Sequence, residues 1–327
     1  MKRVVSFIIL LAVLSAIAGC FATQAEKQTA VGFYLDTAIM LTAYVDDIAV
    51  LEDALKECGR YERLLSRTVE GSDVWNINHA NGQPVPVCSD TIAVLEAARQ
   101  VSDLSGGLFD VTIAPVSTLW DFTSGAAALP GAEQIAAAAK LVDYTRVAID
   151  GDEVTLPEGM MIDLGGIAKG YIADAVKRYL MDRGVESAVL SFGGNVVCIG
   201  LKPDGSCWKV GVQDIDKPTG DYMLVARTFG GSTVTSGISE RGFEFDGKYY
   251  HHILDPRTGR PVENELASVT VFSESSMLGD ALATAAFALG PTAGVTLIEG
   301  LEGVEALFIC RDRSVIRTSG AGEYLVN

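Results

Sequence analysis

Residues 160–200 read MMIDLGGIAKGYIADAVKRYLMDRGVESAVLSFGGNVVCIG. An apolar run, Met160 to Ile162, carries Asp163 to a glycine pair at 165–166, and apolar residues at helical spacing then follow over 172–179. A second apolar run, Ala188 to Phe192, ends in another glycine pair. The pattern predicts a strand, a tight glycine loop, a helix and a second strand.

The glycine loop GGIAKG (165–170) suits close approach of a ligand to backbone N–H groups at a helix start, where phosphate is the usual ligand. It matches neither the Rossmann fingerprint nor a Walker loop. Asp163 would repel a bare phosphate, so its partner is expected to be a sugar hydroxyl, a base edge or a metal. Lys169 could meet a phosphate or a carboxylate. The alternatives are a plain strand-to-helix turn and a solvated lysine.

The rest of the chain mixes helical and strand patterns, with several hairpin signals that do not suit a regular doubly wound parallel sheet. The expected helices are 47–65, 89–104, 126–142 and 276–290; the expected strands are 33–45, 144–149, 153–156, 208–212, 222–229, 233–238, 266–272, 306–310 and 315–318, with a hairpin at 243–250, a short strand within 106–122 and a polar loop at 66–85. We therefore predict an α+β fold with mixed or antiparallel sheets and packed helices, in one domain over 31–327.

Composition and net charge limit the classes of partner that the protein can bind. The 327 residues are 49% hydrophobic and 20% charged, which is ordinary for a globular chain. The formal net charge is −17, so a nucleic-acid partner is not expected.

The N-terminus has the form of an export signal. Lys2 and Arg3 precede an apolar run that ends in Ala18-Gly19-Cys20, a sequence similar to a bacterial lipobox. We expect cleavage of residues 1–19, lipid modification of Cys20, a tether over 20–30 and anchoring to the extracytoplasmic side of the cell membrane. The alternative is an ordinary signal peptide.

The remaining cysteines form no CxxC pair and are odd in number. They are Cys58, Cys88, Cys198, Cys207 and Cys310. We expect buried small apolar residues in place of a disulfide framework or a zinc cluster.

A second candidate site lies in SMLGDALATAAFALG (276–290). Asp280 and Thr284 are four residues apart, so a helix places their oxygens on one face. A carboxylate and a hydroxyl are hard ligands suited to magnesium. The alternative is an aspartate that caps an alanine-rich core helix.

The segment HHILDPRTGRP (251–261) contains two of the three histidines. His252 precedes an apolar pair and the turn start Asp255-Pro256. It could act as a general base. A histidine that only hydrogen-bonds a turn is an equally good reading.

Together, and in this order, DLGGIAKGYIAD, SFGGN, HHILDPRTGRPV, ASVTVF and GDALATAAFALG resemble the ApbE family, the FAD:protein FMN transferases. The resemblance covers about residues 31–327. It implies an α+β fold related to the tunnelling fold, and family members are often exported lipoproteins.

The resemblance also implies a reaction. Such enzymes use a divalent metal to split FAD at its pyrophosphate, transfer FMN to a Ser or Thr hydroxyl of a flavin-carrying subunit of a membrane redox complex, and release AMP. Carried over by position, the FAD contacts would be Leu35, Leu108, Phe109, Asp110, Asp163, Lys169 and Leu254; the Mg²⁺ ligands would be Gly166, Asp280, Thr284 and the carbonyl of Ala283; and His252 would be the catalytic histidine. Leu35 lies in Leu-Asp-Thr, where the family often has Met-Gly-Thr.

Two other functions remain open at this point. A magnesium-dependent FAD pyrophosphatase would use the same residues with water as the acceptor. A lipid-anchored flavin-binding protein without enzymatic activity would not need the Asp280 and Thr284 pair.

Overall fold

An eight-stranded sheet forms the centre of the computed structural model, which describes residues 25–122, 128–215, 217 and 220–326. Every pair of neighbours in it is antiparallel. In sheet order the strands are β1 (Lys27–Tyr34), β2 (Thr37–Tyr44), β6 (Ala188–Phe192), β7 (Asn195–Ile199), β10 (Gly231–Gly237), β15 (Leu266–Ser273), β16 (Glu305–Cys310) and β17 (Val315–Arg317).

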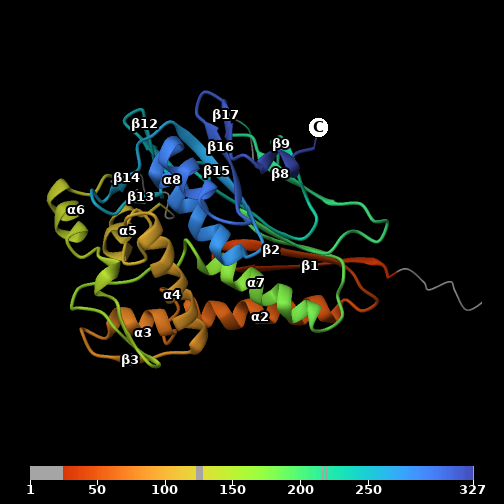
Figure 1. Cartoon of the computed structure of the whole chain (residues 1–327). Coiled ribbons are helices and arrows are strands. Elements are labelled where there is room, and N and C mark those ends of the chain that lie inside the picture. The colour runs from red at the N-terminus through yellow and green to blue at the C-terminus, as the bar shows by residue number, and fades with distance from the viewer. Residues whose placement is uncertain (1–24, 123–127, 216, 218–219, 327) are drawn as a thin grey trace, which may run out of the picture.

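Helices cover one face of this sheet, as Figure 1 shows. They are α2 (Ala49–Leu65), α7 (Ala168–Met181) and α8 (Ser276–Glu299), with α4 (Ser89–Leu104) packed against α8. The main hydrophobic core lies between these helices and the sheet. The hairpin of β8 (Trp208–Gln213) and β9 (Tyr222–Thr228) covers part of the other face, where Val210 and Val212 pack with Phe272.

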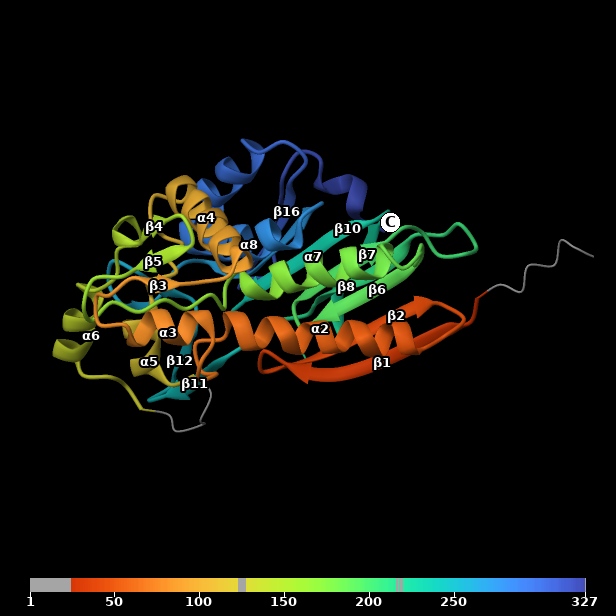
Figure 2. The ribbon, with the colours of Figure 1, turned by 90° about the horizontal axis from the view of Figure 1, so that it is seen from below.

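Two insertions carry the smaller elements. In the insertion between β2 and β6, the elements other than α2, α4 and α7 form a lobe beside the sheet (Figure 2), and the chain between β10 and β15 forms two small hairpins. The first insertion holds α3 (Asp73–His79), β3 (Val85–Pro86), α5 (Ala114–Trp120), α6 (Ala132–Ala139), η1 (Tyr144–Arg146), β4 (Ala148–Asp150) and β5 (Glu153–Thr155); the second holds β11 (Gly242–Phe245), β12 (Lys248–His251), β13 (Leu254–Asp255) and β14 (Arg260–Pro261); η2 (Ala321–Tyr324) lies near the C-terminus.

The predicted fold class is confirmed, but the strand expected over 33–45 is wrong. The chain forms a hairpin there because Leu35 and Asp36 both have positive φ, 54° and 56°. A two-residue turn of this kind normally contains Asn or Gly, so residue type does not predict a turn at Leu35-Asp36. Because β1 begins at Lys27, the folded domain also starts before residue 31 and the expected tether over 20–30 is too long. Cys20 and the signal segment 1–19 lie outside the described residues.

Two further strands are not formed. Within 106–122, and in the run Met160–Ile162, the only strand-like pairing is a single parallel bridge between Ile113 and Met161. Side chains replace the missing ladder: Asp110 accepts hydrogen bonds from Thr112 and from the Tyr144 backbone. Polar side chains that bind backbone in this way compete with strand pairing.

Three helices differ from expectation. The loop at 66–85 contains α3, whose first turn is capped by Ser72. The helix expected over 126–142 is the shorter α6, and residues 123–127 lie outside the described part of the chain. The helix over 276–290 is interrupted at Gly290 as predicted, where φ is 80° and ψ is 177°, but helical structure resumes at Pro291 and continues to Glu299.

All five cysteines in the described residues are free. Cys58, Cys198 and Cys310 are buried as expected, whereas Cys88 is exposed and Cys207 is partly exposed.

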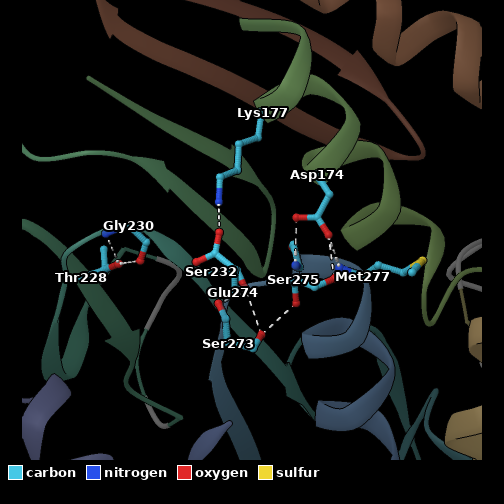
Figure 3. Close-up of polar contacts among 10 residues, drawn as sticks. Asp174, Lys177, Thr228, Gly230, Ser232, Ser273, Glu274, Ser275 and Met277 are labelled. Carbon is cyan, nitrogen blue, oxygen red and sulfur yellow. Dashed lines mark hydrogen bonds and ion pairs between the residues drawn. The ribbon is translucent and has the colours of Figure 1, made fainter. Parts of the chain in front are cut away.

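The contact between α7 and α8 positions the candidate site (Figure 3). Asp174 of α7 accepts hydrogen bonds from the backbone N–H groups of Ser276 and Met277, 2.9 and 3.0 Å away, and from the hydroxyl of Ser275. The first turn of α8 is therefore capped by a carboxylate from α7, the charge that a helix N-terminus prefers. The two helices are fixed to each other at the ends that bear Lys169 and Asp280.

Candidate active site

Side chains hold the loop that contains Asp163. The amide of Asn78 in α3 donates to the carbonyl of Ile162 at 2.9 Å and accepts from its N–H at 2.7 Å. The N–H of Asp163 donates to the carbonyl of Val111 at 2.7 Å. These bonds take the place of a strand and fix where the Asp163 side chain begins.

The carboxylate of Asp163 is neutralised within the protein. One oxygen accepts a hydrogen bond from the N–H of Gly165 at 2.9 Å, and the other lies 3.0 Å from Nε of Arg67. The repulsion of phosphate expected at this loop is therefore offset by a guanidinium. Arg67 was not found from the sequence because it lies almost 100 residues before Asp163, in a loop without a recognisable motif.

The glycine loop and the distant helix α8 meet at Asp280. Its side chain is buried, accepts from the N–H of Gly170 at 3.0 Å and lies 3.6 Å from the ammonium of Lys169. The same ammonium donates to the carbonyl of Gly165 at 3.0 Å. Lys169 thus links the glycine loop to α8. The two candidate sites expected from the sequence, at 165–170 and at 276–290, therefore form one site.

Thr284 and Gly166 lie beside this pair. The hydroxyl of Thr284 is 3.1 Å from that of Ser236, and a Cβ placed on Gly166 would be 3.9 Å from the Thr284 oxygen. Ala283 is fully buried and has no side-chain donor, so only its carbonyl is available. No group of three or more His, Cys, Asp or Glu side chains suited to a metal occurs among the described residues. The oxygen donors present, one carboxylate, one hydroxyl and backbone carbonyls, suit a hard cation that keeps water or phosphate as its other ligands.

His252 follows β12 and is half-buried. Its Nδ1 lies 3.2 Å from the carbonyl of Arg241, which can only accept, so the neutral ring carries its hydrogen on Nδ1 and leaves the Nε2 lone pair available. Burial lowers the pKa of His252 to about 4, and the positive charges of Arg241 and Lys169 act in the same direction. At neutral pH the ring is uncharged and able to accept a proton.

The neighbouring His251 is buried and structural. Its Nε2 is 3.0 Å from the carbonyl of Val262, and its ring packs edge-on against Phe287. Of the two histidines, His252 alone has the partial exposure that contact with a substrate requires.

Glu240 is a further charged group at the site that the sequence did not indicate. Its carboxylate accepts from the N–H of Gly237 at 3.1 Å. Burial raises the pKa of Glu240 and the negative charge of Asp280 adds to this, while Lys169 opposes it. The residue follows a strand without a motif of its own, and only the fold brings it near α8.

The other predicted FAD contacts are dispersed. Phe109 is buried beside Gly166, and Leu108 precedes it. Asp110 is buried and engaged with its own loop; burial raises its pKa, and the hydrogen bonds from Thr112 and Tyr144 oppose that shift. The described contacts do not join Leu35 or Leu254 to the centre around Asp280: the N–H of Leu35 donates to Glu62 at 2.7 Å, and Leu254 packs in a separate apolar cluster. Their contact with FAD stays a prediction.

Comparison with known proteins identifies the family of this chain. Residues 35–308 match the sequence profile of the ApbE family. The chain is 37% identical to an FAD:protein FMN transferase of Klebsiella pneumoniae, over 87% of this chain and 90% of that protein, and 35% identical to one of Treponema pallidum, over 83% and 80%. A crystal structure of the ApbE protein from Thermotoga maritima superposes with a TM-score of 0.84 at 30% identity, covering 92% of this chain and all of that one. The flavin transferase ApbE from Vibrio cholerae gives a TM-score of 0.82 at 26% identity, over 92% of this chain and all of that one. The chain belongs to the ApbE family.

Proposed function

We propose that this protein transfers FMN from FAD to a Ser or Thr hydroxyl of a flavoprotein subunit and releases AMP. The observation that carries the proposal is the contact of Lys169 with Asp280 on α8, the helix that also presents the Thr284 hydroxyl. His252 belongs to the same site, because the positive charge of Lys169 helps to lower its pKa. Relatives 34–37% identical to this chain over most of its length are named FAD:protein FMN transferases.

Magnesium fits the oxygen donors of this site. Asp280, Thr284 and the carbonyls of Gly166 and Ala283 would hold it, and when bound it would neutralise charge on the pyrophosphate oxygens. Lys169 supplies a further positive charge in the same place. Breaking a pyrophosphate requires charge stabilisation more than covalent help, and these groups provide it in a chain that is acidic overall.

His252 serves as the general base. Its Nε2 accepts the proton of the acceptor hydroxyl, the hydroxyl oxygen forms a bond to the FMN-side phosphorus, and the bond to the AMP oxygen breaks. The products are an FMN phosphoester on the acceptor and AMP. The carbonyl of Arg241 holds the ring in the required tautomer.

Mass spectrometry of an acceptor protein tests the proposal. The soluble domain is incubated with FAD, Mg²⁺ and a candidate subunit of a membrane redox complex, and AMP is assayed in parallel. We expect a mass gain of one FMN together with AMP, and both should disappear when EDTA removes the metal. AMP without a mass gain would instead identify a pyrophosphatase, and FAD binding without AMP would identify a flavin-binding protein.

We also propose that the chain is anchored to the extracytoplasmic face of the membrane through a lipid on Cys20, on the basis of its lipobox-like sequence. Full-length wild type should fractionate with membranes, and Cys20→Ala should move to the soluble fraction. An unchanged distribution of Cys20→Ala would contradict the anchor.

A further inference from the structure

Two cations are linked to Gly165 of the glycine loop, one through its N–H and one through its carbonyl. Arg67 reaches it through Asp163, whose carboxylate accepts from the N–H of Gly165. Lys169 reaches it directly, because its ammonium donates to the carbonyl of Gly165 at 3.0 Å. Gly165 is therefore linked to two positive charges in a protein whose net charge is −17.

The contacts of Arg67 within the protein engage only some of the N–H donors of its guanidinium. Nε pairs with Asp163 at 3.0 Å, and Nη1 makes a long hydrogen bond of 3.4 Å to the hydroxyl of Thr118. Arginine carries five N–H donors in a planar fork that matches phosphate oxygens. The side chain retains 36% of its accessible surface, and no hydrogen bond among the described residues involves its Nη2.

An ion pair confined to the protein explains this arrangement less well. An exposed pair of this kind contributes about 0–1 kcal/mol to stability, and the loop is already fixed by Asn78 and by the bond from Asp163 to Val111. The partial exposure of Arg67 instead supports a role for Asp163 in orienting the arginine toward a ligand.

We propose that Arg67 binds the pyrophosphate of FAD together with Lys169, and that Asp163 orients the guanidinium for this contact. The inference rests on the proposed function, since it takes FAD as the substrate. It assigns to Asp163 a role through Arg67, in place of the direct contact with a sugar, a base or a metal expected from the sequence.

A double-mutant cycle tests it, with FAD affinity measured by flavin fluorescence in EDTA and without acceptor. The proteins are wild type, Arg67→Gln, Asp163→Asn and the double variant, with Arg63→Gln as a control because Arg63 is an exposed arginine near the end of α2. Thermal melts without FAD establish that each variant is folded.

We expect Arg67→Gln to weaken FAD binding about 10- to 100-fold in the wild-type background, the range of a lost charge-assisted contact. Asp163→Asn should weaken it less, and should add little in the Arg67→Gln background, because Asp163 acts through Arg67. Arg63→Gln should bind FAD as wild type does. The inference is overturned if Arg67→Gln has no effect, or if Asp163→Asn changes FAD binding equally in the wild-type and Arg67→Gln backgrounds, because Asp163 would then act independently of Arg67.

Salt dependence gives a second measurement if Asp163→Asn fails to fold. The affinity of wild type for FAD should fall with ionic strength more steeply than that of Arg67→Gln, since a phosphate contact is lost in the variant. Equal slopes would overturn the inference. Arg67-dependent FAD binding without FMN transfer would refute only the proposed function, whereas transfer with unchanged FAD binding in Arg67→Gln would refute only this inference.

Discussion

Replacing His252 by Ala is expected to lower the rate of FMN transfer by about 100- to 10,000-fold, the usual contribution of a general base. FAD affinity should change little, because the His252 ring is held by a backbone carbonyl and takes the proton of the acceptor. Transfer rates at saturating FAD, together with FAD binding in EDTA, separate the two effects. A parallel loss of FAD binding and transfer would mean that His252 has a structural role.

The matched control is His79→Ala. His79 is exposed on α3, stacks on Trp75 and hydrogen-bonds its carbonyl at 2.7 Å, outside the contacts of the site. Its replacement should leave transfer near the wild-type rate.

The pH dependence of FMN transfer should reflect the ionisation of His252. A general base must be unprotonated, and the pKa of His252 is lowered to about 4, so activity should persist through neutral pH and fall only as the pH approaches about 4. In wild type we expect the rate of FMN transfer to show this decline at acidic pH. The rate is measured between pH 3.5 and 7, under conditions where the protein stays folded. An acidic limb near 6.5, the ordinary histidine pKa, would contradict the burial of the ring.

The second large effect is expected from Gly170→Ala, which should unfold or severely destabilise the domain. A Cβ at Gly170 would lie 2.1 Å from the carbonyl oxygen of Ser276 and 2.7 Å from Cα of Met277. Both are backbone atoms at the capped start of α8, so neither can rotate away. Overpacking of this kind costs about 3 kcal/mol or more, and separation of the helices would also break the bond between the Gly170 N–H and Asp280.

Urea denaturation of Gly170→Ala measures the loss of stability, and Gly322→Ala is its control. A Cβ on Gly322 meets no atom within 4 Å, so that variant should stay within about 0.5 kcal/mol of wild type. A midpoint for Gly170→Ala equal to that of Gly322→Ala would show that α7 and α8 are not packed as described.

Local patterns predicted the elements that have strong periodicity or turn residues. The helix 89–104 and the strand 188–192 were placed at their observed bounds, and the hairpin around Asp246-Gly247 formed as expected. The patterns failed at a turn without glycine and at a segment where side-chain hydrogen bonds replace strand pairing. Leu35 and Asp36 turn without glycine, and Asn78 substitutes for a strand partner of Ile162.

The sequence by itself determined the α+β class, the family and the short motifs that contain Asp163, Lys169, His252 and Asp280, because each depends on residues close together in the chain. Only the tertiary structure decided that Lys169 meets Asp280, that Arg67 pairs with Asp163 and that Glu240 lies near both Lys169 and Asp280. These contacts join residues from about 40 to 110 positions apart, and no local pattern encodes such separations. They arise from the packing of α7 against α8 and from the insertion between β2 and β6 that returns the chain to the same sheet.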